Sequence, residues 1–176
     1  MERPQLEHII RAASAITGAD KLVIIGSQAV LGQFPDAPAE LLVSVEADVF
    51  TFRGSLDSDL IDGSIGEASP FHRTFGYYAH GVGEETAVLP SGWKERLITI
   101  RSENTGAGIG LCLEVHDLAV SKLIAAREKD LDFISALFRH QLVNEDTIRE
   151  RLRVTSITDK QRDGCLARLS RLAKVE

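Results

Sequence analysis

The sequence has few of the residues that hold very small proteins together. It contains two cysteines among 176 residues, Cys112 and Cys165, and they lie too far apart to form a close pair. A chain of this length removes roughly 70% of its unfolded surface from water on folding, so it can build a core without disulfides or a structural metal. We therefore expect two reduced thiols, and we exclude a disulfide-dependent miniprotein and a structural zinc site.

Long apolar runs are also missing. No stretch approaches the ~20 apolar residues that a membrane span needs. The N-terminal segment MERPQLEHIIRAASAITG mixes charged with apolar positions, unlike a signal peptide. Aromatic residues make up only 6%, but 44% hydrophobic and 26% charged residues are ordinary for a globular protein. These features predict a cytoplasmic protein without a membrane partner.

The chain also lacks an excess of positive charge. Twenty Lys and Arg residues against 26 Asp and Glu residues give a net charge of -6, which argues against non-specific adhesion to nucleic acid. The charge is uneven, however, because residues 139–176 carry 9 basic and 6 acidic side chains. This basic region could bind the phosphates of an acceptor such as RNA, or it could simply be a solvated helical face.

The hydrophobic pattern predicts mixed strands and helices followed by an all-helical end. Helical spacing or apolar runs predict a helix over 5–17, a buried strand over 22–25, a short helix over 28–31, a strand over 41–52, a short helix within 55–68, and strands over 75–82, 97–100 and 109–115. From residue 116 onward we expect helices, two of them meeting near 127–129 and two more starting near 144 and 158. The fold class is therefore α+β, or mixed α/β, in a single domain over 1–176, with a core of about 20–140 and a helical C-terminal extension of about 141–176.

One group of residues suggests chemistry. Gly26 and Ser27 follow a buried strand, where a turn can offer backbone N–H groups and a hydroxyl to phosphate oxygens. Glu46 and Asp48 lie two residues apart on a predicted strand, so their carboxylates project from one side and suit Mg²⁺. The alternative is that Ser27 only caps a helix and that the two acids line a solvated strand face.

These segments carry a resemblance to a known superfamily. IIGSQAVLG followed by SVEADVF resembles the signature of polymerase-β-like nucleotidyltransferases. DLAVSKLIAAREKDLDFISALF is similar to segments of the AbiEii-type branch, which includes toxin-like nucleotidyltransferases of bacterial toxin–antitoxin systems. The resemblance covers about residues 20–140. It implies a small nucleotidyltransferase-type mixed β-sheet flanked by helices.

The resemblance also implies roles for particular residues. Gly26 and Ser27 would hold the triphosphate of a nucleoside triphosphate, and Glu46 and Asp48 would bind the divalent metal, Mg²⁺. Lys122 would contact phosphate. The implied catalytic set is therefore Asp48, Glu46 and Lys122.

A further polar group of the nucleotide site would be Asp130 or, alternatively, Asp132. On one continuous helix Lys122, Lys129 and Asp130 would share a face, whereas a break near residue 127 would change that arrangement. An exposed salt-bridge set would give the same pattern of charges.

The chain departs from the family pattern in three respects. Glu46 stands where the first metal carboxylate is usually Asp, and its extra methylene moves the oxygens outward. The spacing from Ser27 to Glu46 is longer than usual. The third carboxylate is not obvious, and Glu114 is the candidate by position. These departures fit a degenerate protein that binds a nucleotide without reacting.

The segment from 69 to 93 collects histidines and aromatic residues. His72, Tyr77, Tyr78, His80 and Trp93 could line a pocket for a base or an acceptor. Ordinary packing of aromatic residues in a core explains the same composition.

The function expected from the sequence is a nucleotidyltransferase. It would bind a nucleoside triphosphate with Mg²⁺ and transfer a nucleotide to an acceptor hydroxyl, for example on RNA. The alternative is a binding or regulatory module on the same fold, such as a toxin–antitoxin component with an antitoxin-type protein partner. Binding of a nucleoside triphosphate without release of pyrophosphate would distinguish the alternative from the enzyme.

Overall fold

A mixed five-stranded sheet organises the computed structural model, which describes residues 1–174. Its order is β3-β2-β1-β5-β4, and its strands are β1 (Lys21–Ile25), β2 (Glu46–Phe50), β3 (Tyr78–Gly81), β4 (Ile98–Ile100) and β5 (Ile109–Cys112). The pairs β1–β5 and β2–β3 are parallel, whereas β1–β2 and β4–β5 are antiparallel. The predicted α+β class with a mixed sheet is confirmed.

Two helices, α1 (Arg3–Thr17) and α3 (Ser55–Ile65), pack against the sheet and against each other. The apolar positions of α1 at helical spacing are buried, as the sequence predicted: Leu6, Ile9, Ile10 and Ala13. Gly18 ends α1 with a left-handed φ of 68°, which glycine adopts without strain. The same helix therefore starts the chain and anchors the core of the sheet.

The strand predicted over 41–52 is shorter than expected. Only 46–50 form β2, and the preceding turn is the 3₁₀ helix η2 (Ala39–Leu41). The register explains the difference, because β1 pairs with β2 only from Val23 opposite Phe50 to Ile25 opposite Asp48. β1 then ends at the Gly26 turn, so residues 41–45 have no partner strand, and Val43 is 79% exposed.

The strand predicted over 75–82 also begins later than expected. Phe75 ends a helix, α4 (Pro70–Phe75), and β3 starts at Tyr78. Ser69 caps α4 by accepting a hydrogen bond from the backbone of His72, and Gly76 ends it with a φ of 76°. Ser-Pro before a helix and Gly after it are recognisable signals, so this helix could have been predicted.

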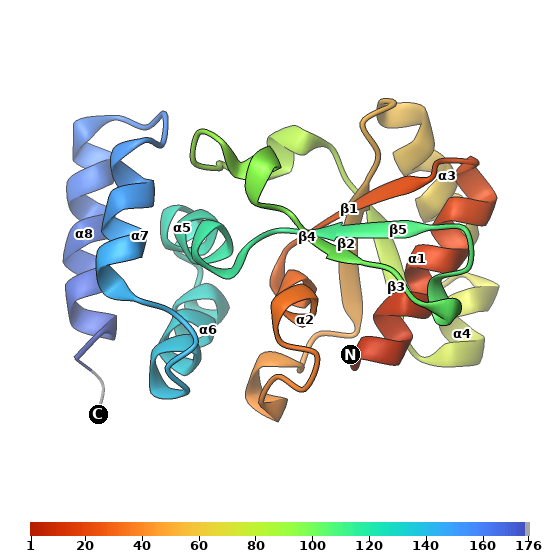
Figure 1. The fold of residues 1–176 in the computed structure, drawn as a ribbon, viewed down its shortest axis with the longest axis horizontal. Coiled ribbons are helices and arrows are strands. Elements are labelled where there is room, and N and C mark those ends of the chain that lie inside the picture. The colour runs from red at the N-terminus through yellow and green to blue at the C-terminus, as the bar shows by residue number, and fades with distance from the viewer. Residues whose placement is uncertain (175–176) are drawn as a thin grey trace.

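The last third of the chain, from residue 115 onward, is helical where the structure describes it. It consists of α5 (Val115–Ala125), α6 (Glu128–Arg139), α7 (Glu145–Arg153) and α8 (Asp159–Leu172), which lie together beside the sheet (Figure 1). Ala126, with a φ of 54°, ends α5, so Lys122 and Asp130 are not on one continuous helix. The two helices meet at the predicted place, because helical φ cannot continue through this residue.

The remaining elements are short and connect these units. They are the helix α2 (Val30–Gln33) and the 3₁₀ helices η1 (Ser27–Ala29), η3 (Glu84–Thr86), η4 (Trp93–Arg96) and η5 (Glu103–Thr105). Within residues 1–174, none of the helices has the length and apolarity needed to cross a membrane.

Candidate functional site

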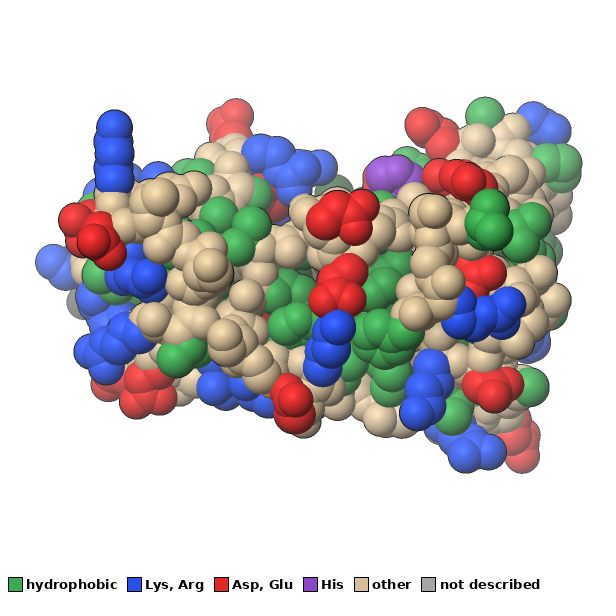
Figure 2. All heavy atoms as spheres, turned by 90° about the horizontal axis from the view of Figure 1, so that it is seen from above, with side chains coloured by type: hydrophobic (Ala, Val, Ile, Leu, Met, Phe, Trp, Pro, Cys, Tyr) green, Lys and Arg blue, Asp and Glu red, His purple; other side chains and the backbone are tan. Residues whose placement is uncertain are grey.

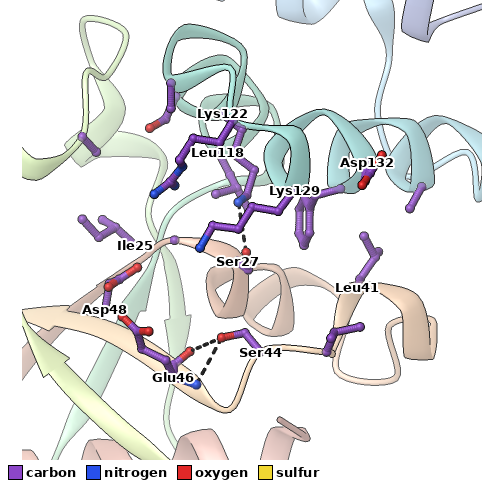
Figure 3. Close-up of a pocket in the computed structure, with 18 of the residues that line it drawn as sticks. Ile25, Ser27, Leu41, Ser44, Glu46, Asp48, Leu118, Lys122, Lys129 and Asp132 are labelled. Carbon is purple, nitrogen blue, oxygen red and sulfur yellow. Dashed lines mark hydrogen bonds between the residues drawn. The ribbon is translucent and has the colours of Figure 1, made fainter. Parts of the chain in front are cut away.

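A pocket of about 990 Å³ lies between the sheet and helices α5 and α6. Its lining includes Gly26 and Ser27 from the turn after β1, Glu46 and Asp48 from β2, and Lys122 from α5 (Figure 3). Eighteen residues separate Ser27 from Glu46 in the chain. The structure thus brings the predicted phosphate-binding turn, the acidic pair and the lysine into one cavity.

The two carboxylates face the pocket because β2 alternates. Ala47 and Val49 are fully buried on the opposite side of the strand, while the side chains of Glu46 and Asp48 are 36% and 29% exposed. Burial and the neighbouring charge of Glu46 raise the pKa of Asp48 above its usual value. The pair therefore carries an unfavourable repulsion that a bound cation would relieve.

Strand β3 adds two polar side chains to the same face. Parallel pairing places Tyr78 opposite Glu46 and His80 opposite Asp48. The Tyr78 hydroxyl donates a hydrogen bond to Glu46 Oε2 at 3.0 Å. His80 Nδ1 lies 3.1 Å from Glu46 Oε1 and 3.2 Å from Asp48 Oδ1. Burial lowers the pKa of His80, but the carboxylates of Asp48, Asp62 and Glu46 outweigh it and raise that pKa overall.

A network of hydrogen-bonded polar side chains lies on the other side of the pocket. Lys122 is 6% exposed, and its amine donates hydrogen bonds to Ser27 Oγ and to Asp130 Oδ1, both at 2.9 Å. The same amine sits 4.6 Å from the centre of the Phe133 ring. Burial lowers the pKa of Lys122, against the opposing effect of Asp130. Lys122 is therefore fixed where one remaining N–H can reach a ligand beside Ser27.

The candidate nucleotide-binding residue Asp130 is fully buried and does not line the pocket. Its carboxylate also accepts a hydrogen bond from Arg127 Nε at 2.6 Å. Burial would raise its pKa, but Arg127 and Lys122 outweigh burial and lower it. Asp130 thus positions Lys122, whereas the alternative residue, Asp132, is exposed and lines the pocket.

Lys129 is the second lysine of the pocket. It extends from the start of α6 toward the side where Asp48 and Glu46 lie (Figure 3). Among the described residues, its amine has no ion-pair partner. The pocket therefore holds two carboxylates on one wall and an unpaired cation that faces them from the other.

Glu114, the candidate by position for a third carboxylate, does not lie in the pocket. It caps α5, accepting hydrogen bonds from the backbone N–H groups of His116 and Asp117, and its other oxygen lies 2.7 Å from His116 Nδ1. His80 stands beside the acidic pair instead, and only the β2–β3 register, which the sequence did not specify, places it there.

The aromatic residues of the segment from 69 to 93 divide between core and site. Tyr77 is buried, with its hydroxyl 2.7 Å from His8 Nδ1, and Trp93 packs edge-on against Phe50. Only Tyr78 and His80 contact the acidic pair. Packing in the core therefore explains Tyr77 and Trp93, whereas Tyr78 and His80 belong to the site.

Within residues 139–174, five of the nine basic side chains make contacts within the fold. Arg149 pairs with Glu145, Arg151 lies 3.4 Å from Asp117, and Arg168 donates to the Leu123 carbonyl. Figure 2 shows Lys and Arg side chains interspersed with Asp and Glu over this end of the molecule. The exposed basic residues of this region without an ion pair in the described chain are Arg153, Lys160, Arg171 and Lys174.

Comparison with known protein families gives a match that covers most of the chain. A family described as "Nucleotidyltransferase of unknown function (DUF6036)" matches residues 4–166. The chain belongs to this nucleotidyltransferase family. The match agrees with the fold and with the predicted superfamily, but it does not confirm the AbiEii-type branch. No curated protein and no solved structure matches the chain.

Proposed function

We propose that this nucleotidyltransferase binds a nucleoside triphosphate with a divalent cation in the pocket between β2 and α5. The observation that supports the proposal is the arrangement of Ser27 and Lys122 opposite Glu46 and Asp48 within one cavity. Cationic and hydroxyl donors on one wall suit phosphate oxygens, and carboxylates on the other suit the cation that accompanies them. An isolated polyphosphate or an isolated cation would use only half of these groups.

In this proposal the residues of the chain act mainly by positioning. Ser27 and Lys122 hold the phosphates at a fixed place, because Lys122 is itself held by Asp130 and Phe133. Lys129, which is unpaired among the described residues, neutralises the remaining phosphate charge. A divalent cation on Glu46 and Asp48, for which Mg²⁺ is the expectation from two carboxylates, would polarise the phosphate that is attacked.

The reaction we propose is transfer of the nucleotide to an acceptor hydroxyl with release of pyrophosphate. RNA is the acceptor to test first, because it offers hydroxyl groups and a phosphate backbone that the exposed cations Arg153, Lys160 and Arg171 can bind. An antitoxin-type protein partner stays a prediction of the resemblance alone.

A binding-only role is the second candidate, and one observation favours it. His80 lies within hydrogen-bond distance of both carboxylates, so it can satisfy them as a cation would. Together with Glu46 in place of the usual Asp, this arrangement fits a protein that binds a nucleotide and acts through a partner.

The test follows the phosphate label. The protein is incubated with total RNA, a divalent cation and each nucleoside triphosphate labelled at the α-phosphate. From the wild type we expect the α-phosphate label in RNA and release of unlabelled pyrophosphate. We expect neither product from Asp48→Asn, and both from Asp59→Asn, which changes an exposed carboxylate outside the pocket. Binding of the nucleotide without pyrophosphate release supports the second candidate. If the protein binds none of the nucleoside triphosphates with any of the cations tested, both the transferase and the binding-only role are contradicted.

A further inference from the structure

His80 belongs to the acidic site by the geometry of the sheet. Parallel pairing sets it directly opposite Asp48, and Ala79, the preceding residue, is fully buried on the other face. Because side chains alternate along a strand, burial of Ala79 directs His80 toward the pocket. Ligand atoms of Glu46, Asp48 and His80 all lie within 4.8 Å of one another.

These three side chains offer two carboxylate oxygens and one imidazole nitrogen. Mg²⁺ strongly prefers oxygen ligands and keeps much of its water, whereas imidazole nitrogen suits first-row transition ions. A mixed set of this kind binds Mn²⁺ and its neighbours in the series more tightly than Mg²⁺. The donor set therefore differs from the one expected from two carboxylates alone.

The surroundings fix the ligands as a metal site requires. Tyr78 donates to Glu46 Oε2, which leaves Oε1 on the side of His80. Metal-binding carboxylates are usually held by such a second hydrogen bond. His80 is 49% exposed at its side chain, so the ring can turn to present a nitrogen to an ion. The extra methylene of Glu46 extends its carboxylate toward β3.

We propose that His80 is the third protein ligand of the cation site and that the site takes a first-row transition dication such as Mn²⁺ in preference to Mg²⁺. The inference rests on the proposed function for the existence of a cation site, but it concerns this chain's own donor set. It gives His80 a role that the family description does not assign.

The test measures Mn²⁺ itself, first alone and then with a non-hydrolysable nucleoside triphosphate. Pulsed electron paramagnetic resonance of Mn²⁺ bound to the wild type should show coupling to an imidazole nitrogen. Calorimetric competition should show Mn²⁺ displaced by Mg²⁺ only at large excess. In His80→Ala the nitrogen coupling should vanish and Mn²⁺ affinity should fall roughly tenfold or more, with a smaller loss for Mg²⁺.

Two further variants separate this role from a general effect. His80→Asp makes the ligand set all-oxygen, so it should lose the nitrogen coupling and shift the preference toward Mg²⁺. His140→Ala removes another exposed histidine that is paired with a carboxylate, Glu40, and should leave Mn²⁺ binding unchanged. Circular dichroism checks that each variant folds. If His80→Ala does not fold, His80→Asp still tests the proposal.

The outcomes distinguish this inference from the proposed function. Nitrogen coupling without any nucleotide binding would support the His80 ligand and contradict the proposed function. Mn²⁺ bound with nucleotide but without nitrogen coupling would overturn the inference and leave the proposed function standing. The inference would also be overturned if Mn²⁺ bound neither alone nor together with the non-hydrolysable nucleoside triphosphate.

Discussion

Gly26 and Asp48 are in closer contact than any other residue type at position 26 would allow. A Cβ placed on Gly26 would lie 2.1 Å from Asp48 Oδ2. Gly26 also has a φ of 69°, a left-handed conformation that side chains rarely adopt. The glycine therefore serves the turn after β1 and, at the same time, makes room for the carboxylate of the neighbouring strand.

The Gly26–Asp48 contact predicts a site-specific effect of Gly26→Ala. The methyl group should displace the Asp48 carboxylate, so cation-dependent nucleotide binding should be lost, and backbone strain should cost about 1–2 kcal/mol of unfolding free energy. Gly18→Ala is the matched control, because Gly18 has a φ of 68° with nothing within 4 Å of its Cβ position. Urea denaturation should show a loss of stability in both variants, and a larger one in Gly26→Ala, because Gly26 has a ψ of -171° and its Cβ would meet Asp48. Calorimetry should show a loss of binding only in Gly26→Ala. Intact binding in Gly26→Ala would contradict the assignment.

A stability test can show whether Asp48 is kept for function. Its folded-state pKa is raised by burial and by Glu46, so its negative charge at neutral pH opposes folding. Asp48→Asn should therefore melt at the same or a higher temperature than the wild type at pH 7 without cations. That advantage should disappear as the pH falls through the raised pKa, where the wild-type carboxyl becomes neutral.

The same variant should also lose the stabilisation that the wild type gains from a divalent cation. Asp59→Asn, on the exposed side of α3, is a control that should keep the wild-type response. A large loss of stability in cation-free Asp48→Asn would instead mark Asp48 as a structural residue.

The buried pair of Lys122 and Asp130 should contribute strongly to stability. Asp130→Asn leaves the amine of Lys122 buried without its counter-charge and should cost about 3 kcal/mol at pH 7. The folded-state pKa of Asp130 is lowered, so the wild type has this contribution above the unfolded pKa and loses it as pH falls through the folded value. The free energies of unfolding that urea titrations give for wild type and variant should therefore become equal at acid pH.

Asp132→Asn, an exposed change on the same helix, should alter stability by less than about 0.5 kcal/mol. Equal losses in Asp130→Asn and Asp132→Asn would show that the buried pair is not the source of the effect.

The exposed cations of the C-terminal helices give a test of an RNA acceptor. Neutralising Arg153 and Lys160 with glutamine should weaken RNA binding and make its dependence on salt shallower by about 1–2 in the log–log slope. Nucleotide affinity should not change, because the pocket does not include these residues. Arg149 and Arg151 are unsuitable for this purpose, since their ion pairs with Glu145 and Asp117 are part of the fold. Identical RNA titrations across a salt series would point to an acceptor without a phosphate backbone.

The sequence by itself determined the elements that depend on local pattern. Buried runs and helical spacing were sufficient for β1, α1 and the C-terminal helices, because burial periodicity follows directly from the order of residues. The Gly26-Ser27 turn and the alternation of Glu46 and Asp48 were visible for the same reason. The resemblance of these segments then predicted a nucleotidyltransferase, and the family match confirms that much.

Tertiary structure decided the features that depend on which strand lies beside which. The register of β3 against β2 placed His80, and not Glu114, next to the acidic pair, and no local pattern specifies a pairing across 32 residues. The turn at Ala126 brought Asp130 back to Lys122 from a different helix and turned an expected nucleotide ligand into a buried counter-charge. Both outcomes arise from contacts between segments that are distant in the chain, whose geometry is set only when the core packs.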